Sequence, residues 1–294
     1  MLPETGLWAD GFTELGYGRD PGLVIFWGLD PQTVARTGNR EPFDWSLVSY
    51  RTRVEVFNSK GKSVSSEERI VDPPKIEDGL LTGGFPAAVH VLLRKAGDYR
   101  VRLEAYPLIE PSAAGLDTLP HRTVEATAHL THVAPEQSSW QISDLFVVHD
   151  MSAWTPGTPR DRTWYEWSLD PAVSRAVTAD SNGSYLAFEV QRGRELVPQC
   201  QATNCRVVVS VTDEAGGLAL QTLRPVPAAF SVSAYVVPIE TVALGPGDYV
   251  ASVEVFEGGE SRARERRAFR VRRRVETAAE RPGGEDEASP MDSP

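Results

Sequence analysis

The amino-acid sequence predicts an all-β protein of two tandem immunoglobulin-like (Greek-key) β-sandwich domains followed by a disordered acidic tail. Three observations predict this fold class. Short runs of alternating apolar and polar residues dominate the chain, turn residues separate them, and one such run recurs 150 positions later. The length of 294 residues fits two domains at roughly 150 residues each.

The chain is expected to divide into five segments. These are an N-terminal extension, a first sandwich, a linker, a second sandwich and the acidic tail, over residues 1–22, 23–148, 149–163, 164–274 and 275–294.

Strand patterns fill the first half. In Gly97 to Tyr106 apolar and polar side chains alternate, so one face of that run belongs in a core. Arg53 to Phe57 leads into turn residues at Asn58 to Gly61, which predicts a hairpin. Trp140 to Val148 is expected to close the first sandwich.

The linker is expected between the halves because His149 to Arg162 holds two prolines, a glycine and several polar residues. After it the strand patterns resume in five runs, at Tyr185 to Val190, Arg206 to Val211, Phe230 to Val237, Tyr249 to Phe256 and Ala268 to Val271.

An internal repeat supports the two-domain prediction. Gly97 to Tyr106 aligns with Gly247 to Phe256 at an offset of 150, with Gly, Asp, Tyr and Glu identical. Upstream, Val54 to Gly61 aligns with Val209 to Gly216 at an offset of 155. A period of this length indicates a duplicated domain and not a solenoid, whose periods are roughly 20–50 residues.

The repeat also predicts a structural tyrosine in each copy. Leu244 to Tyr249 reads as a tight turn that enters a strand through a tyrosine, like the tyrosine corner of Greek-key sandwiches. Tyr249 and its repeat partner Tyr99 are therefore expected at the edge of a core, with the hydroxyl bonded to nearby backbone.

The charge of the chain argues against a general nucleic-acid binder. The net charge is −11, from 30 basic and 41 acidic residues, whereas a phosphate-backbone binder needs a basic face. Residues 275–294 carry six acids, one base and few apolar residues, which predicts disorder.

Arginines concentrate in the last predicted strand, where eight lie between Arg262 and Arg274. They form either the solvent-facing side of a strand or an anchor for an acidic protein partner. A final strand tends to lie at a sheet edge, so Arg270, Arg272 and Arg274 are the candidate protein-binding residues.

Only two cysteines occur, Cys200 and Cys205. Four intervening residues can close a small loop, so a disulfide is a candidate and would suit an oxidising compartment. Two free thiols are the alternative.

The sequence offers little catalytic chemistry. His129 and His132 are three apart on a predicted strand and would point to opposite faces, and no nucleophile elbow, phosphate loop or dinucleotide fingerprint occurs. No catalytic residue, metal site or cofactor is expected, and the chain is not expected to be an enzyme. No apolar run is long enough to predict a membrane span, and the N-terminus lacks the pattern of a signal peptide.

Tryptophans near the expected linker suggest a second route to function. Trp154, Trp164 and Trp167 either seal the contact between the two sandwiches or, if exposed, bind a carbohydrate. The sequence therefore favours a non-enzymatic structural or protein-interaction protein with an unidentified protein partner, and a carbohydrate-binding module is the alternative.

Two short motifs carry a family resemblance. The order of Ile142 to Leu145 (Ile-Ser-Asp-Leu) and then Pro246 to Tyr249 (Pro-Gly-Asp-Tyr) resembles the paired β-sandwich region of bacterial GWxTD domain-containing proteins over roughly Leu23 to Arg273. The Gly-Trp-x-Thr-Asp signature itself is absent, so the activity of that domain is not carried over. The resemblance implies an accessory sandwich pair in an extracytoplasmic location, the periplasm or the cell surface.

Overall fold

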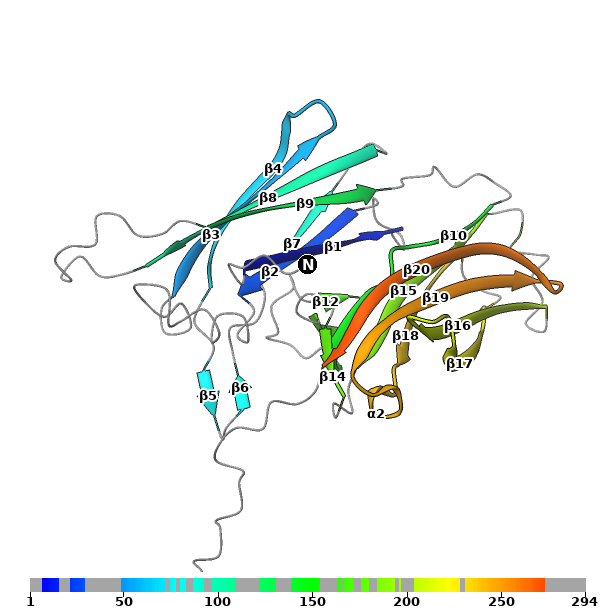
Figure 1. Cartoon of the computed structure of the whole chain (residues 1–294). Helices are drawn as coiled ribbons and strands as arrows, with labels where there is room; N and C mark the ends of the chain where they lie inside the picture. Colours follow the sequence, from blue (N-terminus) through cyan, green and yellow to red (C-terminus); the bar gives the residue numbers. More distant parts are fainter. Residues whose placement is uncertain are drawn as a thin grey trace, which may run out of the picture.

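The computed structural model of the chain is all-β (Figure 1). Strand is almost the only regular structure in the described part of the chain, where a single short helix, α2 (Thr241–Leu244), occurs. The described residues are 7–15, 22–29, 49–71, 75–77, 80–82, 87–92, 97–108, 122–130, 139–153, 163–164, 167–171, 176–179, 184–193, 196, 204–227 and 231–272.

The first half contains two larger sheets. A four-stranded antiparallel sheet, here sheet I, has the order β4-β3-β8-β9, and a three-stranded sheet has the order β1-β2-β7. The bounds in sheet I are Ser63–Val71, Tyr50–Asn58, Gly97–Pro107 and Arg122–Leu130. Those of the three-stranded sheet are Leu7–Glu14, Gly22–Leu29 and Ala87–Leu92. A small hairpin joins β5 (Lys75–Glu77) and β6 (Leu80–Thr82).

Period-two alternation places the core of the first half between these sheets. Trp27 on β2 and Leu103 on β8 are fully buried, and the Trp27 Nε1 donates a hydrogen bond to the buried Thr52 Oγ1 at 2.8 Å. This bond satisfies both buried polar groups across the sandwich, where an unpaired group would be costly.

The second half has the same kind of arrangement. One sheet has the order β10-β15-β11-β13-β12, and β18 pairs with the other side of β15. The bounds are Trp140–Ile142, Tyr185–Arg192, Phe146–Ala153, Trp167–Pro171, Thr163–Trp164 and Val232–Pro238.

The other sheet of the second half, here sheet II, has the order β14-β20-β19-β16-β17. Its strands span Ala176–Thr178, Glu260–Arg272, Gly247–Glu257, Cys205–Asp213 and Leu218–Pro225. All pairs are antiparallel except β14 with β20. Apolar side chains of both sheets form one continuous buried cluster, including Leu186, Phe188, Val209, Val253 and Phe269.

Sheets I and II have the same strand register at equivalent positions. Asn58 pairs with Tyr99 in sheet I, and Asp213 pairs with Tyr249 in sheet II. These positions differ by the sequence offsets of 155 and 150. A register shift follows Val56 in β3 and follows Val211 in β16, again 155 residues apart. The repeated sequences therefore occupy equivalent strands.

The strands expected to close the first sandwich lie elsewhere. β10 and the start of β11 cover Trp140 to Val148, and both pair with β15 of the second half. Trp140, Leu145 and Val147 join the second core. The expected linker, residues 149–163, also contains the end of β11 and the first residue of β12. Strand pattern alone could not distinguish the two partners, because either sheet buries the same alternating face.

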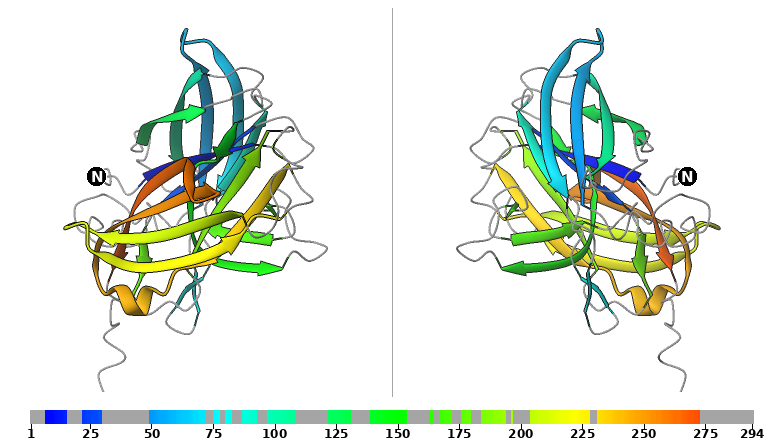
Figure 2. Two further views of the ribbon diagram at one scale, coloured as in Figure 1. Left: turned by 90° about the vertical axis from the view of Figure 1, so that its right-hand side faces the viewer. Right: turned by 90° about the vertical axis from the view of Figure 1, so that its left-hand side faces the viewer.

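The N-terminal strands touch both halves. In Figure 1 the blue strands β1 and β2 lie between sheet I and the second half, and the two views of Figure 2 agree. The Leu15 backbone N–H donates a hydrogen bond to the carboxylate of Glu189 on β15 at 2.5 Å. Glu189 is buried, so this contact joins the first half to the second.

Candidate protein-interaction site

The feature that best suits a ligand is the outer edge of β17 in sheet II. β17 is the last strand in the sheet order, and no described strand pairs with its outer side. Leu218 and Leu223 are exposed there, at 61% and 56%. An exposed apolar edge strand is a ready template for pairing with another chain.

A pocket opens beside this edge. Its volume is about 250 Å³, and it lies between β17 and the end of β18. Leu186, Val209, Val211, Leu220 and Val237 line it with apolar side chains, whereas its polar lining comes from Gln221, Thr222, Arg224 and Glu240. β18 pairs with β15 alone among the described strands, so the pocket lies between two open strand edges.

One end of β17 is held to β18. The Tyr235 hydroxyl donates a hydrogen bond to the carbonyl oxygen of Pro225 at 3.0 Å, and its ring stacks on Phe188 with centroids 5.2 Å apart. Burial raises the pKa of Tyr235 to about 12, so the hydroxyl stays protonated as the donor. This hydrogen bond joins β17 and β18 at Pro225, and the pocket lies where the two strands separate.

The other end of β17 is fixed by a tight turn. The Gly217 N–H donates to Asp213 Oδ1 at 2.6 Å, and Gly216 has a φ of +81° that favours glycine. The first copy repeats this turn. There the Lys62 N–H donates to Asn58 Oδ1 at 3.1 Å, and Gly61 has a φ of +74°.

Arg224 is the charged group of β17 that faces the pocket. Its Nη1 donates to Thr222 Oγ1 and to the carbonyl oxygen of Leu223, each at 3.1 Å. Both acceptors are neutral. Glu240 lines the same pocket, but no ion pair joins it to Arg224 among the described residues. The guanidinium therefore keeps donor capacity for a carboxylate.

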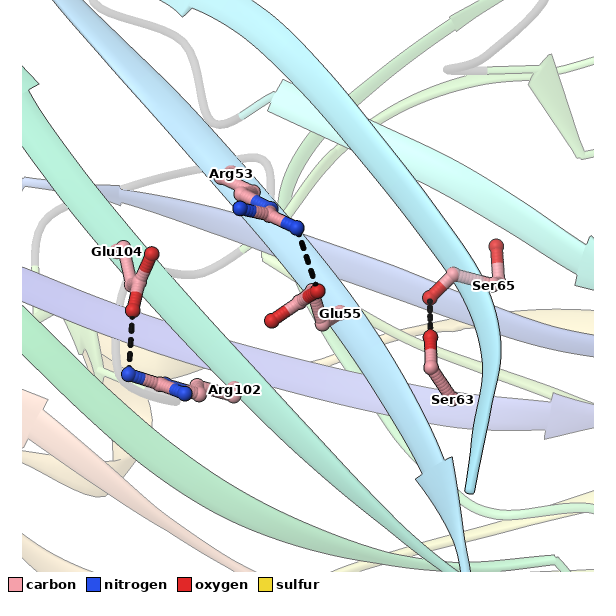
Figure 3. A network of polar contacts seen from close by, with 6 residues as sticks. All are labelled: Arg53, Glu55, Ser63, Ser65, Arg102 and Glu104. Carbon is pink, nitrogen blue, oxygen red and sulfur yellow. Dashed lines mark hydrogen bonds and ion pairs between the residues drawn. The ribbon is translucent and has the colours of Figure 1, made fainter. Parts of the chain in front are cut away.

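The arginine at the equivalent edge of sheet I is paired within its own strand. Arg69 on β4 corresponds to Arg224, and its Nε donates to Glu67 at 2.6 Å. Two further ion pairs lie on β3 and β8 of sheet I: Arg53 with Glu55 at 2.8 Å and Arg102 with Glu104 at 2.5 Å (Figure 3). Exposed apolar groups on β4 are Val64 and Ile70.

The arginines predicted as the docking edge are placed differently. Arg270 and Arg272 lie on β20, and β14 pairs with the backbone at both positions. This part of the last strand is therefore internal to the sheet, because the β14 segment returns alongside it. Arg274 lies outside the described residues.

Two arginines on the exposed face of β20 are paired with carboxylates. Arg270 forms a two-point ion pair with Asp248, in which Nη2 lies 2.6 Å from Oδ2. The hydrogen bond from Arg270 lowers the pKa of Asp248. Arg262 pairs with Glu257 at 3.1 Å and with Glu260 at 3.0 Å. Arg266 is exposed and has no described partner, so one guanidinium of this face stays open.

The predicted tyrosine corner has the expected contacts in the second copy. The Tyr249 hydroxyl donates to the backbone carbonyls of Leu244 and, at 3.3 Å, Gly245. Its ring stacks on Phe269 with centroids 5.8 Å apart. Tyr99 is buried at the equivalent position of sheet I.

The cysteine and tryptophan predictions fall partly outside the described residues. Cys205 is buried and disulfide-bonded, but Cys200 is not described, so their pairing stays a prediction. Trp154 is not described either. Trp164 and Trp167 pair across β12 and β13, and their side chains lie outside the described part of the structure.

The described residues contain no group of three or more His, Cys, Asp or Glu placed to hold a metal ion. One further carboxyl has a shifted pKa: burial raises the pKa of Glu265, which lies on the interior face of β20. In the same part of the chain, no helix is long and apolar enough to cross a membrane.

No family model and no curated protein matches the chain. One solved structure with some likeness is a Bifidobacterium dentium beta-glucuronidase complexed with coumarin-3-O-glucuronide, at 9% identity and a TM-score of 0.24. The match covers 85% of this chain and 39% of that one. This likeness carries no argument about function, and the GWxTD resemblance stays a prediction.

Sequence reasoning missed the β17 edge. The signal was present in Leu218 to Leu223, where three leucines follow a turn without an acidic residue among them. In β4 the equivalent positions hold serines and glutamates, so comparing the two copies position by position would have found it.

Proposed function

We propose that this chain is a non-enzymatic protein-interaction protein of two immunoglobulin-like modules, and that it holds an extended segment of a partner protein along β17. The strand orders support the modules. In the first half β2 pairs with β1 and β7, as in A-B-E, and in the second half β15 pairs with β10 and β18. The facing strands follow the order C′-C-F-G, as β4-β3-β8-β9 and as β17-β16-β19-β20. The tyrosine at the start of the F-like strand fits this assignment.

The observation that carries the proposed binding is the exposed apolar edge of β17 beside a pocket. An added strand gains main-chain hydrogen bonds along the edge, and alternate side chains enter the pocket. The exposed Leu223 would be covered on the opposite face. No chemistry is required of the site, so binding is the function proposed.

The test uses a displayed library of random ten-residue peptides, selected on the full chain. Enriched peptides should slow hydrogen exchange of the amides in residues 218–225 and leave those in residues 63–71 unchanged. The exposed substitution Leu223→Lys should weaken binding at least about tenfold, because a charged edge residue opposes pairing. Ile70→Lys on β4 is the matched control, because Ile70 is also an exposed apolar edge residue, at 64%. Selected peptides that protect other strands, or that bind Leu223→Lys undiminished, would reject the proposed function.

A further inference from the structure

The partner segment can be described further, on the basis of the proposed function. We propose that the strand bound at β17 carries a carboxylate that Arg224 binds, together with an apolar side chain that fills the pocket. The occupant is thus an extended segment of another protein in which an acidic residue precedes an apolar residue by four positions.

Strand alternation gives the spacing. Leu220, Thr222 and Arg224 face the sandwich interior, because the residues between them are exposed. A strand added antiparallel to β17 meets these positions in reverse order, from Arg224 to Leu220. Its first inward side chain lies opposite Arg224, its second opposite Thr222 and its third opposite Leu220.

Charge complementarity identifies the first of these side chains. The neutral acceptors of Arg224 leave most of its donors for a ligand, and a carboxylate can take two in parallel. In the first copy Glu67 supplies this group to Arg69. Position 222 of the second copy is threonine instead, which leaves the carboxylate to come from the partner.

The pocket identifies the third side chain. Leu186, Val211 and Val237 line the pocket with apolar side chains, and Val211 pairs with Leu220. A volume of about 250 Å³ is several times the roughly 30 Å³ occupied by one water molecule. An apolar side chain of the partner therefore fits here with a gain from burial.

Glu240 separates the two ends of the site. It follows β18 and lines the pocket with Leu186 and Ile239. β17 lies opposite β16, with Leu220 paired to Val211 and Arg224 paired to Val207. The segment that contains Glu240 leads from β18 to β19, whose Tyr249 pairs with Asp213 at the end of β16. Leu220 lies nearer to that end of β16 than Arg224 does, so Glu240 lies toward the Leu220 end of the site. A carboxylate there would be repelled, so the acid is expected at the Arg224 end alone.

The experiment compares peptide selections on two forms of the full chain. On the wild type, sequences that protect residues 218–225 from exchange should be enriched in Asp or Glu four positions before an apolar residue. On Arg224→Glu the same position should change to Lys or Arg. In fluorescence anisotropy, Arg224→Gln should weaken an acidic peptide about tenfold and leave its Gln counterpart unchanged. Arg69→Gln is the matched control and should change neither.

The outcomes separate this inference from the proposed function. Peptides that protect β17 without any acidic preference would overturn the carboxylate and leave the proposed function standing. An absence of peptides that protect β17 would overturn both. Sedimentation that shows self-association lost in Leu223→Lys would assign the edge to a second copy of this chain and overturn the inference.

Discussion

Sheets I and II share their backbone register but differ at the edge strand. β4 presents Ser65, Glu67 and Arg69 toward its interior side, and β17 presents Leu220, Thr222 and Arg224 at the equivalent positions. The turn and the central strands fix the backbone, because their glycine and core positions are constrained in both copies. The edge side chains pack against fewer neighbours, so they can differ while the fold is kept. In Figure 2 the two edges lie far apart, with the blue hairpin of β3 and β4 remote from yellow-green β16 and β17.

This difference teaches where binding can arise in a repeated module. An edge arginine with a carboxylate beside it, as in Arg69 with Glu67, is satisfied within its own strand. An edge arginine with a hydroxyl beside it, as in Arg224 with Thr222, keeps capacity for a ligand. The equivalent positions Glu67 and Thr222 therefore account for the different pairing of the two edge arginines.

The largest expected effect tests whether the two halves are separate cooperative units. Leu103 and Val253 occupy equivalent core positions and are both fully buried. Leu103→Ala should cost about 2–5 kcal/mol in unfolding free energy, and Val253→Ala less, because it deletes less side chain. Denaturant unfolding followed by tryptophan fluorescence should show two transitions, with each variant lowering only one. A single transition that both variants shift together would break the comparison between two modules.

A smaller effect is expected at the tyrosine corner. Tyr249→Phe removes the hydrogen bonds to Leu244 and Gly245 from a buried position, which should cost about 1–3 kcal/mol in unfolding free energy. Tyr99→Phe is the matched variant in the first copy. Equal losses, measured by urea denaturation, would indicate that both copies use the same corner, and an unaffected Tyr99→Phe would limit it to the second.

The turns should respond alike in both copies. Gly61 and Gly216 both have positive φ, and a Cβ at either would meet nothing within 4 Å. The cost of Gly61→Ala or Gly216→Ala is therefore backbone strain alone, about 1–2 kcal/mol. Thermal melts of the two variants measure it. A loss in one copy and not in the other would show that the two turns are not equivalent.

The sequence predicted much of this fold for a definite reason. The alternation in Gly97 to Tyr106 shows which face of the strand is buried, and the repeated Gly-Asp-Tyr motif shows that the two strands hold equivalent positions. Both are local properties of the chain. The confirmed all-β class follows from them. The run Trp140 to Val148 was predicted to belong to the first half, but it pairs with β15 of the second half. Its alternating pattern shows which face is buried and does not show which sheet buries it.

The candidate site was harder to predict because it depends on neighbours in space. The arginine density of the last strand was visible in the sequence, but the pairing of Arg270 with Asp248 and the added strand β14 were not. The pocket beside β17 arises where strands from two sheets diverge, and no local pattern reports such a gap. That position 222 holds threonine and not an acidic residue becomes informative only when it is compared with Glu67 at the equivalent position of the first copy.

The smallest expected effect concerns the ion pair of Asp248 with Arg270. The hydrogen bond from Arg270 holds the pKa of Asp248 below its usual value of 3.8. A carboxyl whose pKa is lowered by folding adds stability above its unfolded pKa, and loses it as the pH falls through the folded pKa. Asp248→Asn should therefore flatten the fall in unfolding free energy below about pH 4 and change little at pH 7, because exposed pairs contribute only about 0–1 kcal/mol.

The matched control for that pair lies in the first copy. Asp98 occupies the position equivalent to Asp248, and its cross-strand neighbour is His129 in place of an arginine. Urea denaturation between about pH 7 and pH 2 compares Asp248→Asn with Asp98→Asn. A flatter acid limb for Asp248→Asn alone would assign the effect to the Asp248 carboxylate and its pair with Arg270. Equal slopes for the two variants and the wild type would show that the pair between Asp248 and Arg270 adds no stability.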